Sequence, residues 1–519
     1  MLEKMRKSTI YTSLLALSLL SCTKDFQDVN TDPNNITVIT QRELPFMFAK
    51  AQSSAAMNRS FYQTVQNLGA DLYAQYFALT TNSFSTDRYL LTPDWQRRFW
   101  TVVYVDTAPQ LKSILENTDP KSGEAALANI MWVYAFHRLT DHFGPIPYFG
   151  AAEANDVIPY DPMDKIYADF FEKLTVAVAN LKALPAGTKI FQGYDLIFDG
   201  DTDRWIRFAN SLRLRLALRI AKVDASKAKT EAEAAVAAGL MSSNSHNASM
   251  LKSLSGNDTN GLAQVAVWNE FSMSSTIASY LKGYADPRLG IYFQPSYTGK
   301  VFNSVRNGAT ATDLGNVRNQ SGSNSNVGTY WVRYNGAAIE GNFTQNFHVM
   351  CTAESFFLRA EGALNGWNMG GEAKQLYEDG IKTSMEQWGV TESAQINSYI
   401  ISDRVPAAPG DYHNSAAVAS TPVRWAASPA EQREQIGIQK WLAIYPNGME
   451  AWAEYRRTGF PKMYPLIQSD NADLPVGTFI KRLPYPLTEA TDNLTELNKG
   501  RALLGGTDNA ATKLWWDVD

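Results

Sequence analysis

Four glutamates in two helical segments are the residues best placed for acid–base chemistry. Glu354 and Glu361 are seven residues apart, so they share one helix face, while Glu450 and Glu454 lie in a second segment. Glycoside hydrolases use two carboxyl groups held about 5–10 Å apart. Glutamates on a helix face also form salt bridges or face solvent, and we favour this structural interpretation. Paired-carboxylate glycoside hydrolysis is kept as an alternative function.

A cluster of aspartates before a tryptophan suggests a calcium site. Asp195 is followed by Asp199, Asp201 and Asp203, and the stretch partly matches a calcium-binding loop. It lacks the glycine at the sixth position and the bidentate glutamate at the twelfth. Acidic residues also cap helices and favour the positive end of the helix dipole, so we interpret 201–203 as the entry to a helix that includes Trp205. The sequence leaves open whether calcium binds near 195–203.

Other common catalytic and cofactor motifs are absent from the sequence. There is no glycine-rich phosphate loop, no His-Glu-x-x-His, no Cys-x-x-Cys and no Gly-x-Ser-x-Gly. Of the five histidines, His137 and His142 are five residues apart and would diverge on a helix. We therefore expect no metal site and no cofactor. The net charge of −5, without a basic patch, argues against nucleic acid as a partner.

Aromatic side chains in loop-rich segments are the remaining candidates for a binding site. Tyr89, Trp95, Tyr330, Trp331 and Tyr334 lie in or beside polar stretches. Sugar rings present C–H groups that pack on aromatic planes, and pockets for such ligands combine aromatic walls with a few polar groups. Packing in the core or in a loop explains each ring taken singly. We nevertheless predict these five residues as ligand contacts, and we predict no catalytic residue.

The N-terminus has the features of an export signal for a lipoprotein. Lys4, Arg6 and Lys7 precede a mostly apolar run over 10–20. This run is too short for a transmembrane helix, which needs about 20 apolar residues. The sequence Leu19-Leu20-Ser21-Cys22 resembles the bacterial lipobox, in which the cysteine thiol receives a diacylglyceryl group. We predict a signal peptide over 1–21, lipidation at Cys22 and a polar, flexible tether over 22–40.

Cys351 is the second of two cysteines in the chain. With Cys22 lipidated, no internal disulfide can form. No histidine pattern accompanies Cys351, so we interpret it as a buried small hydrophobe and not as a catalytic thiol.

Hydrophobic periodicity predicts an all-α, mainly helical fold built from consecutive helix pairs. The spacing is that of degenerate tetratricopeptide-like repeats and not of a regular 34-residue array. Two regions, 240–350 and 390–430, have loop composition, and the first contains apolar positions typical of short strands. Loops on a rigid scaffold are where recognition is usually found. The predicted helices span 43–56, 95–117, 123–140, 164–184, 205–222, 226–238, 353–364 and 371–388.

A set of motifs extends over nearly the whole chain. The motifs are Cys22-Thr23-Lys24-Asp25-Phe26, Asn30-Thr31-Asp32-Pro33-Asn34, Asp141-His142-Phe143-Gly144-Pro145-Ile146-Pro147-Tyr148, the stretch 195–220, Tyr284-Ala285-Asp286-Pro287-Arg288-Leu289, the helix 353–361, the stretch 439–457, and Lys513-Leu514-Trp515-Trp516-Asp517. Together they resemble one family, the SusD/RagB-like nutrient-binding outer-membrane lipoproteins of the Bacteroidota, and their order and number make the resemblance specific.

The resemblance implies about four tetratricopeptide-like helix pairs and a loop-rich half, together one domain over 41–519. It implies no enzymatic activity. It also implies a partner, a SusC-like TonB-dependent barrel transporter, to which a surface-exposed lipoprotein delivers a glycan or oligopeptide as a hinged lid. Because ligand residues differ among family members, none is transferred by motif. A helical-repeat structural adaptor of the envelope is the other alternative.

Overall fold

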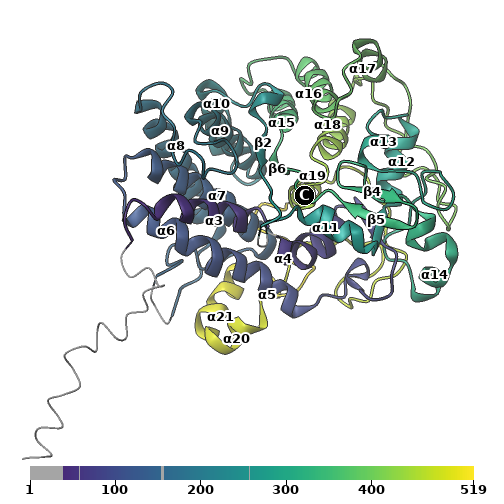
Figure 1. Ribbon diagram of the computed structural model, residues 1–519, viewed down its shortest axis with the longest axis horizontal. Helices are drawn as coiled ribbons and strands as arrows, with labels where there is room; N and C mark the ends of the chain where they lie inside the picture. Colours follow the sequence, from purple (N-terminus) through teal and green to yellow (C-terminus); the bar gives the residue numbers. More distant parts are fainter. Residues whose placement is uncertain (1–38, 58, 154–156, 256–257, 519) are drawn as a thin grey trace, which may run out of the picture. The chain divides into compact units, whose positions relative to one another are not determined.

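Helix pairs form one side of the main unit of the structure. The computed structural model describes residues 39–57, 59–153, 157–255 and 258–518 (Figure 1). The predicted signal peptide, Cys22 and all but the last two residues of the predicted tether lie outside these ranges. The chain divides into Met1–Leu44 and one large unit, Pro45–Asp519, which contains the helices and strands discussed here apart from Leu44. None of the described helices combines the length and the apolar character needed to cross a membrane.

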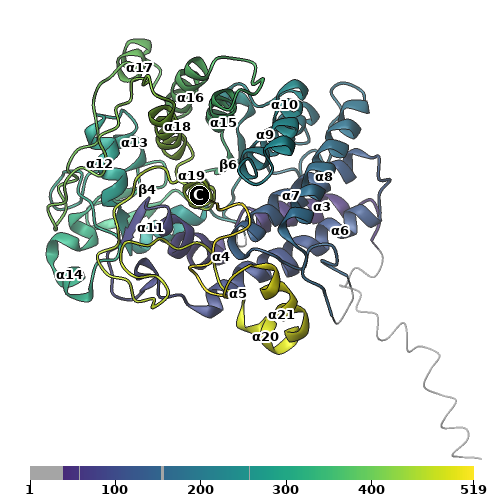
Figure 2. The same ribbon diagram turned by 180° about the vertical axis from the view of Figure 1, so that it is seen from behind.

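The predicted helices are present, and consecutive helices from α6 (Ala108–Glu116) to α10 pack on one another, while α15 packs on α9 and α16. In both views α7 to α10 lie on one side of the unit, and α15, α16 and α18 continue the series (Figures 1 and 2). α19 follows α18 and packs back on α7, so the helix series closes on itself. The bounds are α3 Leu44–Ala55, α7 Gly123–Phe143, α8 Met163–Ala183, α9 Thr202–Arg219, α10 Ala225–Ala238, α15 Thr352–Leu364, α16 Ala373–Gln387, α18 Pro429–Ala443 and α19 Gly448–Thr458.

Capping residues and one glycine explain where these helices begin and how closely they pair. The side chains of Ser122, Asp201 and Asn447 accept hydrogen bonds from the first-turn amides of α7, α9 and α19. On α16, a Cβ at Gly380 would stand 2.8 Å from the Phe357 ring of α15. Glycine is therefore required for the close pairing of α15 with α16.

The predicted helix over 95–117 is divided into three continuous segments. An α-helix, α5 (Pro93–Thr101), leads into a wider turn, η3 (Val102–Thr107), and then into α6 (Ala108–Glu116). Pro109 has no amide hydrogen to donate within a regular α-helix, and Thr107 Oγ1 donates instead to the Val102 carbonyl over 2.7 Å. The π-type turn absorbs this interruption without ending the helix.

The other side of the unit consists of short elements joined by long loops. The region 240–350 was expected to contain loops and short strands, and the hairpin of β4 and β5 confirms strands at Val332 and Tyr334. The same region also contains helices that composition did not predict, α11 to α14. The bounds are α4 Arg59–Phe61, η1 Tyr62–Asp71, β1 Phe77–Leu79, η2 Thr86–Arg88, η4 Asn244–His246, β2 Ala248–Met250, α11 Gly261–Trp268, β3 Phe271–Met273, α12 Ser275–Gly283, α13 Leu289–Tyr292, α14 Ala311–Gly315, η5 Val317–Asn319, η6 Ser321–Ser323, β4 Val332–Asn335, β5 Ala338–Gly341, β6 Phe347–Met350, α17 Ser393–Ile400, α20 Leu487–Asp492 and α21 Leu494–Leu503.

Three antiparallel strand pairs hold this side together. β1 pairs with β3, β2 with β6 and β4 with β5. The first two pairs join segments of this side that are far apart in the sequence.

A cluster of buried ion pairs lies where five helices meet, and we call it the charge network. Arg215 binds both oxygens of Glu354 at 2.7 Å, and Arg457 binds both oxygens of Glu361 at 2.7 and 2.6 Å. Arg219 contacts three carboxylates from two other helices. Its members, drawn from α7, α9, α15, α18 and α19, are Asp141, Arg215, Arg219, Glu354, Glu361, Lys440, Glu450, Glu454 and Arg457.

Removing one carboxylate from the charge network is predicted to destabilise the fold strongly. Glu354→Gln leaves the Arg215 guanidinium buried without its full counter-charge, a defect that costs about 3–5 kcal/mol. Urea denaturation of the two proteins measures the change in the free energy of unfolding. Glu386→Gln is the matched control, because its ion pair with Lys382 is exposed and 3.9 Å long, and it should change stability by less than about 1 kcal/mol. Equal effects of the two variants would contradict a central role for the network.

Candidate binding site

The glutamates considered for catalysis are structural ion-pair partners. Glu354 is 1% exposed, and both of its oxygens are bound by Arg215. Glu361 is held in the same bidentate way by Arg457, and Glu450 and Glu454 bind Arg219. A general acid or base must reach the substrate, and these carboxylates reach arginines instead. The paired-carboxylate hydrolase alternative is therefore wrong for these residues, and the favoured salt-bridge interpretation is confirmed.

The aspartate cluster before Trp205 is a helix entry. Asp201 is the N-cap of α9, as predicted, and its side chain accepts a hydrogen bond from the Arg204 amide. Asp195 is buried and accepts hydrogen bonds from the Trp205 indole and the Gly200 amide, both at 2.7 Å. Its oxygens are thus used inside the protein. Among the described residues, no group of three or more His, Cys, Asp and Glu side chains has the arrangement of a metal site.

Cys351 is a buried, unreactive thiol, as the sequence predicted. It immediately precedes α15, and only 5% of the residue is exposed. Burial raises the pKa of the thiol to about 12, so the thiolate that acts as a nucleophile does not form near neutral pH.

Two of the five predicted ligand contacts are buried in this structure. The Tyr89 ring packs edge-on against Tyr73 at 5.8 Å, and Tyr89 is 2% exposed. Trp331 is 1% exposed and packs against Trp388 and Tyr445. These two rings contribute to the core and present no face to solvent.

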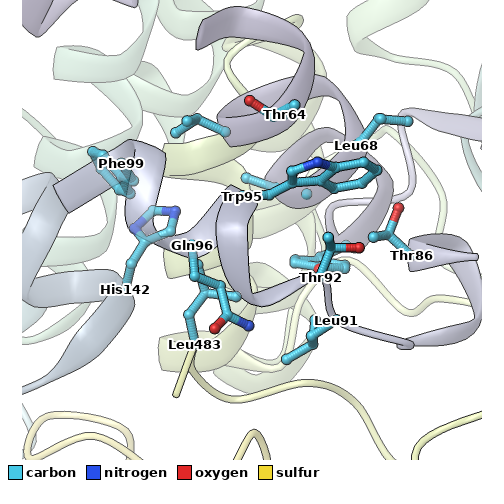
Figure 3. A pocket seen from close by; sticks show the side chains of 14 residues that line it. Thr64, Leu68, Thr86, Leu91, Thr92, Trp95, Gln96, Phe99, His142 and Leu483 are labelled. Atoms are coloured by element: carbon cyan, nitrogen blue, oxygen red, sulfur yellow. The ribbon is translucent and has the colours of Figure 1, made fainter. Parts of the chain in front are cut away.

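Trp95 is half-buried in the first turn of α5, at the mouth of a small cavity (Figure 3). Its ring meets Phe84 edge-on at 5.7 Å, and the side chains of Leu68 and Thr86 lie beside it. The cavity encloses about 30 Å³, which is room for a water molecule or two but not for a sugar ring. A ligand could reach only the outer part of the Trp95 ring.

Tyr330 belongs to an aromatic cluster with His348 and Trp388. Its ring stacks on His348 at a centroid distance of 5.7 Å, and Trp388 meets both rings edge-on. The hydroxyl of Tyr330 donates to the Asn346 carbonyl. Tyr330 is half-buried, so one part of its ring reaches solvent.

Tyr334 lies in the β4–β5 hairpin beside a second tyrosine. The rings of Tyr297 and Tyr334 are 5.5 Å apart and tilted by 43°, and both side chains are half-buried. Lys300 Nζ lies 4.9 Å from the centre of the Tyr297 ring. The two tyrosines therefore form a small aromatic surface with a neighbouring cation.

Trp268 is an exposed aromatic residue that sequence reasoning missed. It ends α11, which packs on β4 and β5, and 45% of the residue is exposed. No other tryptophan is as exposed in the part of the chain that the structure describes. The signal that could have found it is the N-cap Asn260 before a short apolar run, since Asn260 accepts a hydrogen bond from the Ala263 amide. Because α11 packs on the β4–β5 hairpin, we group Trp268 with the Tyr297–Tyr334 pair and call the three residues the hairpin aromatic surface.

Comparison with known proteins identifies the family. The family model described as "SusD-like: Susd and RagB outer membrane lipoprotein" matches residues 28–517. The chain belongs to the SusD-like family. It is thus an outer-membrane lipoprotein of a family of binding proteins without catalytic activity. The expected mainly helical fold with tetratricopeptide-like pairs is confirmed as well.

Solved SusD-like structures superpose on most of the chain. A chitin-binding SusD homolog from Flavobacterium johnsoniae is 33% identical in sequence and superposes with a TM-score of 0.83. The match covers 92% of this chain and 99% of that chain. A SusD homolog from Bacteroides thetaiotaomicron is 30% identical and superposes with a TM-score of 0.82, and the match covers 91% of this chain and 98% of that chain. A structure described as a chitin-binding protein is 26% identical and superposes with a TM-score of 0.76, and the match covers 92% of this chain and 100% of that chain. The comparison with curated proteins gives no match.

Acid is predicted to destabilise this SusD-like protein through His348. Burial lowers the pKa of His348 to about 4, so the folded protein keeps the ring neutral while an unfolded chain protonates it near pH 6.5. This contribution to stability is complete above pH 6.5 and is lost as the pH falls from 6.5 to 4, by at most about 1.4 kcal/mol per pH unit.

Thermal or urea unfolding at pH 4, 5, 6 and 7 measures this effect. His348→Gln keeps a polar side chain but removes the titration, so its stability should fall less steeply over the same range. Parallel pH profiles for the two proteins would contradict the assignment.

Proposed function

We propose that this lipoprotein captures a glycan at the cell surface through the hairpin aromatic surface. The observation that carries the proposal is the relative 33% identical to this chain over nearly its full length, which is described as chitin-binding. Three aromatic side chains of this chain, from α11, the loop before α14 and β4, are at least partly open to solvent on adjoining elements. We therefore take a β-linked N-acetylglucosamine oligomer as the first ligand to test.

The proposed binding mode is stacking of sugar rings combined with hydrogen bonds to a neighbouring lysine. Trp268 supplies the widest exposed ring, and the Tyr297–Tyr334 pair supplies a second stacking position. Beside this pair, the exposed Lys300 has its Nζ 4.9 Å from the centre of the Tyr297 ring and can donate to sugar hydroxyl groups. Such surfaces need no catalytic geometry, in keeping with a protein that binds and releases.

Trp95 and Tyr330 are proposed as outer contacts for a longer oligomer. α5 packs on η1, η1 on α11, and α11 on the hairpin, so a continuous series of elements connects Trp95 with the hairpin aromatic surface. Tyr330 precedes β4 by two residues. An oligomer that extends past the hairpin would meet these half-buried rings at their exposed edges.

Delivery to a SusC-like TonB-dependent barrel is the second part of the proposal. The family description as outer-membrane lipoproteins supports an anchor, and we propose that it is a lipid on Cys22 after removal of 1–21. Each methylene of an acyl chain that enters the bilayer contributes about 0.8 kcal/mol to membrane binding, so several chains hold a protein stably. The segment 22–40 would then act as the tether that lets the domain open and close above its transporter.

Binding of an N-acetylglucosamine hexamer to the purified lipoprotein in detergent tests the proposed ligand. Trp268→Ala should weaken binding about 5- to 30-fold, the loss of roughly 1–2 kcal/mol expected for a stacking residue. Phe149→Ala is the matched control, because Phe149 is 54% exposed on a different segment and should leave binding unchanged. Calorimetry with a tetra-alanine peptide distinguishes an oligopeptide ligand. Absence of binding across glycan and peptide panels would contradict the proposal.

Removing the proposed lipid site is predicted to release the protein from the membrane. Cys22→Ala should move the chain from the outer-membrane fraction to the soluble fraction and abolish its cleavage by protease added to whole cells. Purification of the unaltered protein should yield a TonB-dependent barrel, whereas recovery of other envelope proteins without a barrel would favour the structural adaptor. Retention of the Cys22→Ala protein in the membrane would contradict the anchor.

A further inference from the structure

A second, larger cavity lies on the helical side of the molecule. It has a volume of about 590 Å³, within the range of small-molecule pockets, which run from about 300 to 1,000 Å³. Its walls come from α18, the C-terminal ends of α15 and α19 with the residues after them, and the turn between α9 and α10. No residue of the hairpin aromatic surface lines it.

One wall of this cavity is apolar and partly aromatic. Trp367 and Phe460 are half-buried, so they form a wall at the opening to solvent, and Leu364 and Ile436 lie with them. Gly437 keeps Phe460 close to α18, because a Cβ at that position would stand 2.6 Å from the Phe460 Cβ. This wall can therefore contact a flat or apolar part of a ligand.

The remaining lining carries more positive than negative charge. Four cationic side chains face two carboxylates, and the two carboxylates are already engaged by the charge network. These residues are Lys222, Arg433, Lys440 and Arg457 with Glu361 and Glu454. Lys440 and Arg457 are matched by carboxylates of the charge network, whereas Arg433 adds a positive charge that no described carboxylate matches.

One of these cations lacks a carboxylate partner. The ammonium group of Lys440 is enclosed by the charge network, with Glu454 at 2.9 Å and Glu354 and Glu450 each at 3.9 Å. Arg433, half-buried on α18, takes part in no ion pair with any residue that the structure describes. The guanidinium of Arg433 therefore has donors available to a ligand in the cavity.

We propose that this cavity binds a ligand that carries both a carboxylate group and an apolar face. Arg433 would bind the carboxylate oxygens, because a guanidinium can donate two parallel hydrogen bonds to such a group. Trp367 and Phe460 would contact the apolar face of the ligand. Glu361 and Glu454 disfavour a doubly charged phosphate or sulfate by repulsion, which selects the singly charged carboxylate.

Two natural sources supply this chemistry, an acidic sugar of the uronate type and the free C-terminus of a peptide. The cavity is separate from the glycan site proposed above, so each proposal can fail without the other. Trp268→Ala should leave carboxylate binding unchanged, and Arg433→Gln should leave binding of the N-acetylglucosamine hexamer unchanged.

Calorimetry of the purified lipoprotein with four probes tests the inference. Glucuronate is compared with glucose, and N-acetylphenylalanine with its C-terminal amide, so that each carboxylate has a neutral counterpart. At least one carboxylate should bind while its counterpart does not, and binding should weaken in 0.5 M NaCl. Binding of glucuronate alone assigns an acidic sugar, and binding of N-acetylphenylalanine alone assigns a peptide terminus.

Arg433→Gln should weaken carboxylate binding at least tenfold. The variant removes a half-buried charge that has no ion pair to break, and an unchanged melting temperature confirms its fold. The inference is overturned if neither carboxylate binds, if the neutral probes bind equally well, if Arg433→Gln binds normally, or if sulfate binds more tightly than both carboxylates.

Discussion

Complete pairing of buried charges is the constraint on which the rest of this structure depends. The charge network places arginines of α9 among carboxylates of α7, α15 and α19, and Arg219 alone contacts three of them. Each of these ions loses several kcal/mol of hydration on burial, and the loss is recovered only when every partner is in place. The helices that supply them must therefore pack in one arrangement. This requirement explains why α19, far along the chain, returns to pack on α7.

A rigid helical side allows the other side to be irregular. The strand pairs β1–β3 and β2–β6 join distant segments of the loop-rich side, and α11 packs on the β4–β5 hairpin. Aromatic residues on this side divide into buried rings such as Trp331 and exposed rings such as Trp268. The buried rings fix the loops, and the exposed rings are left available for a ligand. Loops of this kind can vary without altering the scaffold that carries them.

The helical scaffold could be predicted from the sequence because its signals are local. Asp201 caps α9, and apolar spacing within α8 or α16 shows the buried face of each helix without reference to any other part of the chain. Whether Glu354 belongs to a catalytic pair or to a salt bridge could not be decided from such local signals. Its partner Arg215 is 139 residues away, and the sequence shows only that a carboxylate lies on a helix face.

The binding surface was harder to predict because exposure depends on tertiary contacts. Tyr89 and Trp331 have polar neighbours in the sequence, yet long-range contacts bury them, while Trp268 follows buried apolar residues and is exposed. The short helix that carries Trp268 is stabilised by η1 and the hairpin, and composition alone indicated a loop. The cavity beside the charge network likewise combines four segments that are distant in the sequence, so no single motif marks it.

A crystal structure of the protein with a bound N-acetylglucosamine oligomer tests the central claim most directly, because it shows both the ligand and its place on the scaffold. The account predicts a sugar ring stacked on Trp268, with the oligomer running along the β4–β5 hairpin past Tyr334. An oligomer bound away from these residues, or none bound at saturating concentration, would contradict it.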